Sequence, residues 1–265
     1  MTDKKINRVL IGLVSLLCLI ACAGMQGNRG QAEGHLAVGA AFIKSGEYTE
    51  ALRELFAAEK ITPNDPTVHY YLGIAYLGKE ARDRAFREFQ KAVDLNPDYS
   101  EAHNYLGTLY LERNQWDPAI ASFDRALSNI LYDTPAVSLY NKGWALYKKG
   151  EYRKSVECNR KAMKLRDAYP LMPLLQKNTG LSCLALAQHP EASDHFTRAL
   201  KLVPDFAEAQ YWLAVTKVRQ RNYTEASGLF QDLIQKNPQS EFSVRGKEML
   251  EKMKKGKYEE VRWNP

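Results

Sequence analysis

Three histidines recur at a constant spacing in this sequence, and imidazole is the first side chain to consider for chemistry. His35, His69 and His103 lie 34 residues apart. Imidazole nitrogens are common zinc ligands, so a ladder of histidines is a candidate metal site. If each histidine holds the same place in a repeated pair of helices, two helix diameters separate neighbours, roughly 20 Å. Zinc–nitrogen bonds are only about 2 Å long, so these histidines cannot share an ion, and packing is the favoured interpretation.

The remaining histidines and the cysteines do not form a recognisable reaction centre. His189 and His195 are six residues apart, with no paired Cys or Glu at ligand spacing. Cys158 and Cys183 lack a nucleophile-like context, and the sequence contains no P-loop, dinucleotide fingerprint or nucleophile elbow. A bridge between these cysteines could form in an oxidising compartment, but two small buried thiols are favoured. We therefore predict no enzyme activity, no cofactor, no metal and no small-molecule substrate.

The three spaced histidines each open a phrase that the chain repeats. The phrase reads HYYLGIAY from His69 and HNYLGTLY from His103, and a looser copy, HLAVGAAF, starts at His35. A period of 34 residues that carries an apolar residue, then Gly, then an aromatic is typical of the tetratricopeptide helix-turn-helix unit. Most of this chain is thus predicted to be a stack of helix pairs, and such stacks usually serve as binding surfaces.

The repeat can be followed along most of the chain. Six units are predicted, over 32–65, 66–99, 100–133, 136–169, 173–206 and 207–240. In each unit a small residue lets the first helix (A) lie close to the second (B), and aromatic side chains fill the remaining space. A helix over 241–255 is predicted to cap the last apolar face, with a tail over 256–265. The predicted fold class is all-α, a tetratricopeptide-repeat solenoid of six helix pairs plus a C-terminal capping helix.

The fourth unit departs from the pattern. Lys142, Asn159 and Asp167 occupy positions where the other units favour Leu, Phe and Pro. Additional residues flank the unit, at 134–135 and at 170–172. These departures predict either a hinge between units one to three and units four to six or simply a longer loop.

The first residues of the chain do not belong to the repeats. Lys4, Lys5 and Arg8 precede a short apolar run with a small-residue ending, which predicts a secretory signal peptide over 1–21. The run is too short for a comfortable membrane span, and an uncleaved N-terminal anchor is the alternative. In both cases the helical part is predicted to be exported.

The end of the apolar run, Leu19-Ile20-Ala21-Cys22, resembles the lipobox of bacterial lipoproteins. This resemblance implies cleavage before Cys22 and acylation of that cysteine. More than one acyl chain gives stable membrane anchoring. The segment over 22–31 is then a lipidated cysteine with a short tether. By analogy with lipoproteins, Ala23 after the cysteine favours the outer membrane, with the repeats facing the periplasm, although the inner membrane stays open.

Charge gives little reason to expect a nucleic-acid partner. The chain has 37 Lys and Arg against 31 Asp and Glu, a net charge of +6 at pH 7. The excess is mild and spread along the helices. One local cluster stands in a predicted solvated final helix, at Lys247, Lys252, Lys254, Lys255 and Lys257. An exported lipoprotein would not meet nucleic acid in any case.

The surface expected to bind a partner is the groove side of the A helices. Residues spaced by three and four along a helix share one side, and here that side is apolar and aromatic. The predicted partner-binding residues are Leu36, Ile43, Tyr70, Ile74, Leu77, Tyr140, Trp144, Tyr147, Leu181, Leu184, Tyr211 and Val215. Tyr140, Trp144 and Tyr147 are the predicted hot spot, since large aromatics dominate binding energy. An apolar groove favours an amphipathic helix or an aliphatic strand, although part of the stripe would be core in a tightly wound stack.

The combination of lipobox, tether, six repeats and capping helix resembles the pilotin family of type IV pilus biogenesis, which includes myxobacterial social-gliding lipoproteins. The resemblance covers essentially the whole chain. It also includes a Leu-Tyr-Pro-like segment before an Asn-x-Gly at the junction of repeats three and four. The residues that match there are Leu131, Tyr132, Pro135, Asn141 and Gly143.

This resemblance implies a non-enzymatic role in envelope assembly. Pilotins help secretin subunits reach the outer membrane and assemble there into the ring through which the pilus passes. The expected partners are therefore a secretin subunit and, through the lipid on Cys22, the membrane. A tetratricopeptide scaffold lipoprotein of another envelope complex is the alternative.

Overall fold

The computed structural model describes residues 29–257, and these residues form helices without strands. The predicted signal peptide, Cys22 and most of the tether lie outside the described residues, as does the end of the tail. None of the described helices is both long and apolar enough to span a bilayer.

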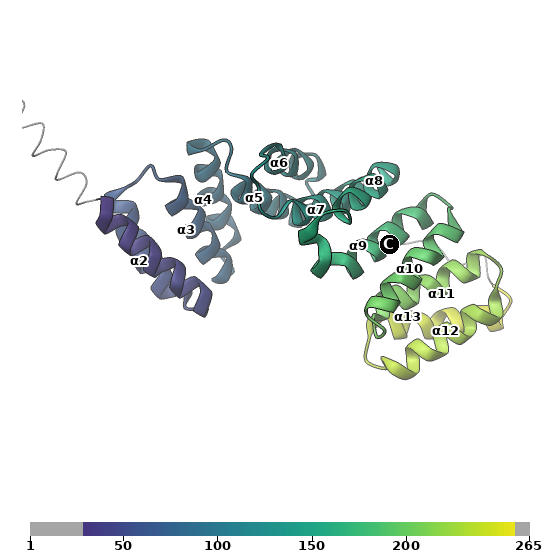
Figure 1. The fold of residues 1–265 in the computed structure, drawn as a ribbon. Helices are drawn as coiled ribbons and strands as arrows, with labels where there is room; N and C mark the ends of the chain where they lie inside the picture. The colour runs from purple at the N-terminus through teal and green to yellow at the C-terminus, as the bar shows by residue number, and fades with distance from the viewer. Residues whose placement is uncertain (1–28, 258–265) are drawn as a thin grey trace, which may run out of the picture. The chain divides into compact units, whose positions relative to one another are not determined.

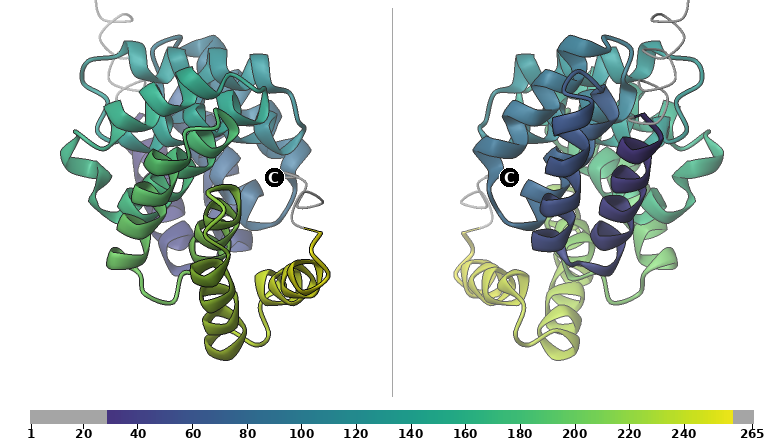
Figure 2. Two further views of the ribbon diagram at one scale, coloured as in Figure 1. Left: turned by 90° about the vertical axis from the view of Figure 1, so that its right-hand side faces the viewer. Right: turned by 90° about the vertical axis from the view of Figure 1, so that its left-hand side faces the viewer.

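The helices are short and follow one another in hairpin-like pairs (Figures 1 and 2). The first helix covers 29–45. The elements after it are α2 (Tyr48–Ile61), α3 (Pro66–Gly78), α4 (Arg82–Leu95), α5 (Ser100–Glu112), α6 (Trp116–Ser128), α7 (Pro135–Lys148), α8 (Tyr152–Ala162), the 3₁₀ helix η1 (Arg166–Leu171), α9 (Met172–Ala185), α10 (His189–Leu202), α11 (Ala207–Arg219), α12 (Tyr223–Lys236) and α13 (Glu241–Lys254). Within the described residues this makes six pairs followed by one further helix, so the predicted fold class is confirmed.

One residue in the left-handed region makes the turn inside each pair. Gly46 and Gly150 have φ values of 80° and 87°, which glycine adopts without steric cost. In the other pairs φ lies between 57° and 61° at the same place, in Glu80, Asn114, Ala187 and Arg221. A Cβ atom disfavours this region, so packing of the flanking helices must stabilise those turns.

The chain divides into two compact units, one up to Leu109 and one from Tyr110. The boundary therefore falls within α5 rather than beside the fourth repeat. Each unit has its own core, built on fully buried phenylalanines of the B helices. These are Phe89 in the first unit and Phe123, Phe196 and Phe230 in the second.

The close approach of paired helices depends on small residues in the A helices. A Cβ added to Gly73 of α3 would lie 2.6 Å from a ring carbon of Phe89 in α4, closer than real Cβ contacts. In the fourth repeat Gly143 of α7 faces Asn159 of α8 in the same way. Asn159 is fully buried, and its side-chain amide has no hydrogen-bond partner among the described residues. An unsatisfied buried polar group costs about 1–3 kcal/mol, so the Asn159 amide lowers the stability of this pair by an amount of that order.

The other departures of the fourth repeat are compensated by polar contacts. The carboxylate of Asp167, in η1, accepts a hydrogen bond of 2.8 Å from the backbone N–H of Ala136 at the start of α7. Lys142 forms an ion pair with Asp124 of α6. The additional residues after α8 are thus an ordered 3₁₀ turn tied to α7.

Candidate functional site

In the first unit all the predicted groove residues keep part of their side chains accessible. They are Leu36, Ile43, Tyr70, Ile74 and Leu77. Leu36 and Ile43 belong to the helix over 29–45 and pack on the core of α2 and α3. The other three lie four and three residues apart in α3, so they share one side of that helix. An apolar stripe of the first unit thus reaches solvent.

Tyr70 is the centre of an aromatic cluster in this unit. Its ring centroid lies 5.0 Å from that of Tyr99, 5.2 Å from Tyr71 and 6.0 Å from Tyr105. The ring of Tyr105 stacks on the buried ring of Phe89 at 4.9 Å and 3°. Of the four tyrosines, only Tyr70 is among the predicted groove residues. A signal for two of the others was present, because Tyr71 and Tyr105 occupy the same position of successive repeats.

In the second unit the structure separates the predicted groove residues into two groups. Tyr140 and Trp144 of α7 remain partly exposed. The others are core residues that retain little surface for a partner: Tyr147, Leu181, Leu184, Tyr211 and Val215. The predicted hot spot of three aromatics is thus reduced to two, because Tyr147 is only 3% exposed and lies stacked on Trp144 at 5.1 Å.

Trp144 is held by a buried lysine from the next A helix. The ammonium nitrogen of Lys177 in α9 lies 5.2 Å from the centroid of the Trp144 ring and 3.3 Å from a carboxylate oxygen of Glu208 in α11. Burial lowers the pKa of Lys177, while the Glu208 carboxylate counteracts that shift. The lysine, the tryptophan and the carboxylate therefore form a satisfied cation–π and ion-pair triad.

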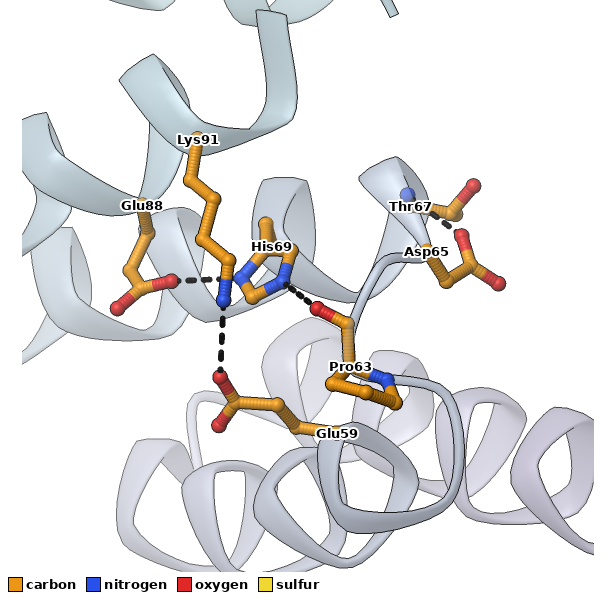
Figure 3. Close-up of polar contacts among 7 residues, drawn as sticks. All are labelled: Glu59, Pro63, Asp65, Thr67, His69, Glu88 and Lys91. Atoms are coloured by element: carbon orange, nitrogen blue, oxygen red, sulfur yellow. Dashed lines mark hydrogen bonds and ion pairs between the residues drawn. The ribbon is translucent and has the colours of Figure 1, made fainter. Parts of the chain in front are cut away.

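His69 forms polar contacts inside the first unit (Figure 3). The side chain is fully buried. Its Nε2 lies 2.9 Å from the carbonyl oxygen of Pro63, and its Nδ1 lies 2.8 Å from a carboxylate oxygen of Glu88 in α4. The carbonyl of Pro63 and an ionised Glu88 carboxylate both accept, so the protonated imidazole, which donates from both nitrogens, satisfies both contacts. Burial lowers the pKa of His69, but the hydrogen bonds to Glu88 and Pro63 outweigh burial and raise it above 6.5 overall.

Three other histidines bridge the two helices of a pair or contact the loop before their own helix. His35 contacts Glu54 at 2.7 Å, 19 residues later, as His69 contacts Glu88. His103 repeats the second contact, with the carbonyl oxygen of Pro97 at 2.8 Å. In the fifth pair the histidine is in the B helix instead of the A helix: the ring of His195 contacts the side chain of Gln176 in the A helix at 2.7 Å. Sequence reasoning missed these bridges, although a Glu placed 19 residues after two of the spaced histidines was a visible signal.

The cysteines are not arranged for chemistry. Cys158 and Cys183 are both buried and unbridged, and burial raises the pKa of each thiol to about 11. The thiolate that a nucleophile needs is therefore scarce at neutral pH. Within residues 29–257, no group of three or more His, Cys, Asp or Glu side chains could hold a metal ion.

An all-helical stack of pairs with a turn glycine, packed phenylalanines and partly exposed aromatic A-helix faces is a repeat protein of the binding type. Models of the tetratricopeptide repeat match residues 39–79, 70–133, 136–169 and 178–241. These matches cover most of the sequence, so the chain belongs to the tetratricopeptide-repeat family. Comparison with curated protein sequences gives no match.

Several solved structures share the fold. PilW, described as a widely conserved type IV pilus biogenesis factor, superposes with a TM-score of 0.70 at 21% identity, over 81% of this chain and 97% of PilW. PilF of Pseudomonas aeruginosa gives a TM-score of 0.70 at 15% identity, over 83% of this chain and 97% of PilF. YrrB, a tetratricopeptide protein with an unusual peptide-binding site, gives a TM-score of 0.62 at 18% identity, over 73% of this chain and 97% of YrrB. At these identities the likeness concerns the fold.

Proposed function

We propose that this protein is a non-enzymatic assembly factor of a type IV pilus machine, anchored to the outer membrane by a lipid on Cys22. In this proposal its A-helix faces bind a secretin subunit in the periplasm. The protein promotes localisation of that subunit to the outer membrane and its assembly into multimers, which is the role of a pilotin.

One observation carries the proposal. The fold matches that of PilW, a type IV pilus biogenesis factor, and that of PilF over 97% of their own lengths, with a TM-score of 0.70 in both cases. Proteins of the repeat family mediate protein–protein contacts, and in this chain partly exposed apolar side chains are available on both units: Leu36, Ile43, Tyr70, Ile74 and Leu77 in one, and Tyr140 and Trp144 in the other. A partner segment with an apolar side would bury those residues.

The membrane anchor is the second part of the proposal. It rests on the lipobox-like Leu19-Ile20-Ala21-Cys22 and on the basic and apolar residues before it. Acyl chains on Cys22 would keep the repeats near the membrane in which the secretin must assemble. The anchor would then raise the local concentration of the subunits that the repeats hold.

Deletion and complementation test the proposal. Cells without the protein should lose heat-stable secretin multimers from the outer membrane. The wild-type chain should restore them, whereas Cys22→Ser and the double substitution Tyr70→Ala with Trp144→Ala should not. Normal secretin multimers in the deletion strain would contradict the proposed function and favour another envelope complex.

The chain offers a matched control for the aromatic substitutions. Tyr169 in η1 is 81% exposed and lies outside the A helices. Tyr169→Ala removes an aromatic of the same size and should leave secretin assembly unchanged. Far-ultraviolet circular dichroism of each variant would show whether the helices are retained.

A further inference from the structure

The aromatic cluster around Tyr70 is more than an apolar patch, because its rings are fixed around one exposed face. Tyr70 of α3 contacts Tyr71, Tyr99 and Tyr105, with centroid separations of 5.0 to 6.0 Å. Phe89 lies beneath the cluster, where it is fully buried and stacks on Tyr105. The four tyrosines themselves are only partly buried. The first unit thus presents several π systems in fixed orientations at its surface.

The charged groups that act on this cluster are carboxylates. Burial raises the pKa of Tyr70 and of Tyr99, and Glu101 adds to both shifts because its negative charge disfavours a tyrosinate. Asp65 acts on Tyr99 in the same direction. In the part of the chain that the structure describes, Glu101 has no ion-pair partner, and no cation lies over the ring of Tyr70 or Tyr99.

In the second unit, basic side chains lie over aromatic rings. There Lys177 lies over Trp144 and pairs with Glu208, and Arg245 of α13 lies 4.5 Å from the ring centroid of Tyr211. An aromatic face beside a carboxylate is favourable for a cation, since the ring quadrupole and the negative charge act together. The second unit supplies these cations from its own chain. Around Tyr70 the aromatic face and the carboxylate are present, and the cation must come from outside.

We propose that the face formed by Tyr70, Tyr71, Tyr99 and Glu101 binds an arginine or lysine side chain carried by an apolar segment of a partner protein. The neighbouring Ile74 and Leu77, on the same side of α3, would contact the apolar residues of that segment. This deepens the proposed function, on which it rests for the identity of the partner, by naming the side chain that the first unit recognises. The choice of a cation follows from charge complementarity with Glu101.

A pair of synthetic peptides tests the inference directly. The probes are acetylated and amidated Leu-Val-Arg-Val-Leu and the same peptide with citrulline, which has nearly the same shape as arginine without its charge. Both are titrated into the full-length protein carrying ¹³C-labelled tyrosine rings, and the dissociation constants are read from ring signals. A cation–π contact contributes about 0.5–2 kcal/mol, so the arginine peptide should bind roughly tenfold more tightly.

Charge-only substitutions in the protein provide the second arm. Glu101→Gln should reduce the preference for arginine to within about threefold, because the ring contacts alone remain. Glu80→Gln is the matched control: it removes the same charge from the exposed turn after Gly78, about 15 Å along α3 from Tyr70, and should keep the preference. Equal binding of the two peptides, binding of neither, or equal effects of the two substitutions would each overturn the inference.

Comparison with the genetic test keeps this inference distinct from the proposed function. If deletion of the protein abolishes secretin multimers but arginine and citrulline peptides bind alike, the cationic site is wrong and the assembly role stands. If the arginine preference is found while multimers form normally in the deletion strain, the site stands and its partner is another protein.

Discussion

Replacing the buried histidine of the first unit should weaken that unit in a pH-dependent way. His69 donates to the carbonyl of Pro63 and to the carboxylate of Glu88, and its own side chain is inaccessible to solvent. His69→Leu keeps much of the side-chain volume and removes both hydrogen bonds. Pro63 then loses the partner of its carbonyl, and Glu88 loses a positive charge.

The size of the effect follows from the surroundings of the two acceptors. A hydrogen bond to a charged group contributes about 1.5–3 kcal/mol. The Glu88 side chain is 23% exposed, so water can partly replace the imidazole there, and the two bonds should not contribute their full sum. We expect His69→Leu to lower the free energy of opening α3 and α4 by roughly 2–3 kcal/mol at acidic pH. His103→Leu is the matched control, since His103 contacts Pro97 from a partly exposed position and should contribute less, about 1 kcal/mol.

The pH dependence has a definite sign. The pKa of His69 is raised in the folded protein above 6.5, so the protonated form is stabilised by folding. This contribution is fully present below pH 6.5 and is lost as the pH rises through the folded-state pKa. The difference between wild type and His69→Leu should therefore be largest near pH 5.5 and shrink towards pH 9.

Hydrogen exchange of peptides from α3 and α4 is the appropriate assay, because it reports local opening of one unit in a chain that has two. The urea dependence of exchange at pH 5.5 and at pH 9 gives the opening free energy of each variant. A His69→Leu deficit that is constant with pH, or that grows towards pH 9, would refute the assignment of a buried imidazolium.

Three further predictions concern the second unit. Ala187 has φ of 57° in the turn between α9 and α10, so Ala187→Gly should raise the stability of this unit by about 0.5–1 kcal/mol, measured by thermal unfolding. A lower melting temperature would contradict the strain argument. Asn159→Leu replaces an unsatisfied amide facing Gly143 by an apolar group of similar shape, and urea unfolding should show a gain of about 1 kcal/mol. A loss would mean that the amide has a partner such as buried water. Burial raises the pKa of Cys158 and Cys183 to about 11, so iodoacetamide at pH 7.5 should modify neither thiol in the folded protein and both in urea, as mass spectrometry would show.

The sequence alone was sufficient for the architecture, because the features that define this fold are local and periodic. The small residue at Gly73 and the aromatic residue at Phe89 recur 34 residues later, which identifies a helix pair. Repetition of the pair implies the stack. The left-handed turns at Glu80 and Ala187 were not foreseen, since neither residue type favours that conformation. There the packing of the helix pair overrides local preference.

The binding surface depended much more on the tertiary structure. Helical spacing places Trp144 and Tyr147 on one side of α7, but only the packing of neighbouring helices decides that Trp144 stays partly exposed and Tyr147 does not. Likewise, His69 and Glu88 become partners only when α3 and α4 are laid side by side. Periodicity along one helix determines which residues share a side. The exposure of a side chain and its contacts depend on residues that are distant in the sequence and come close only when the chain folds.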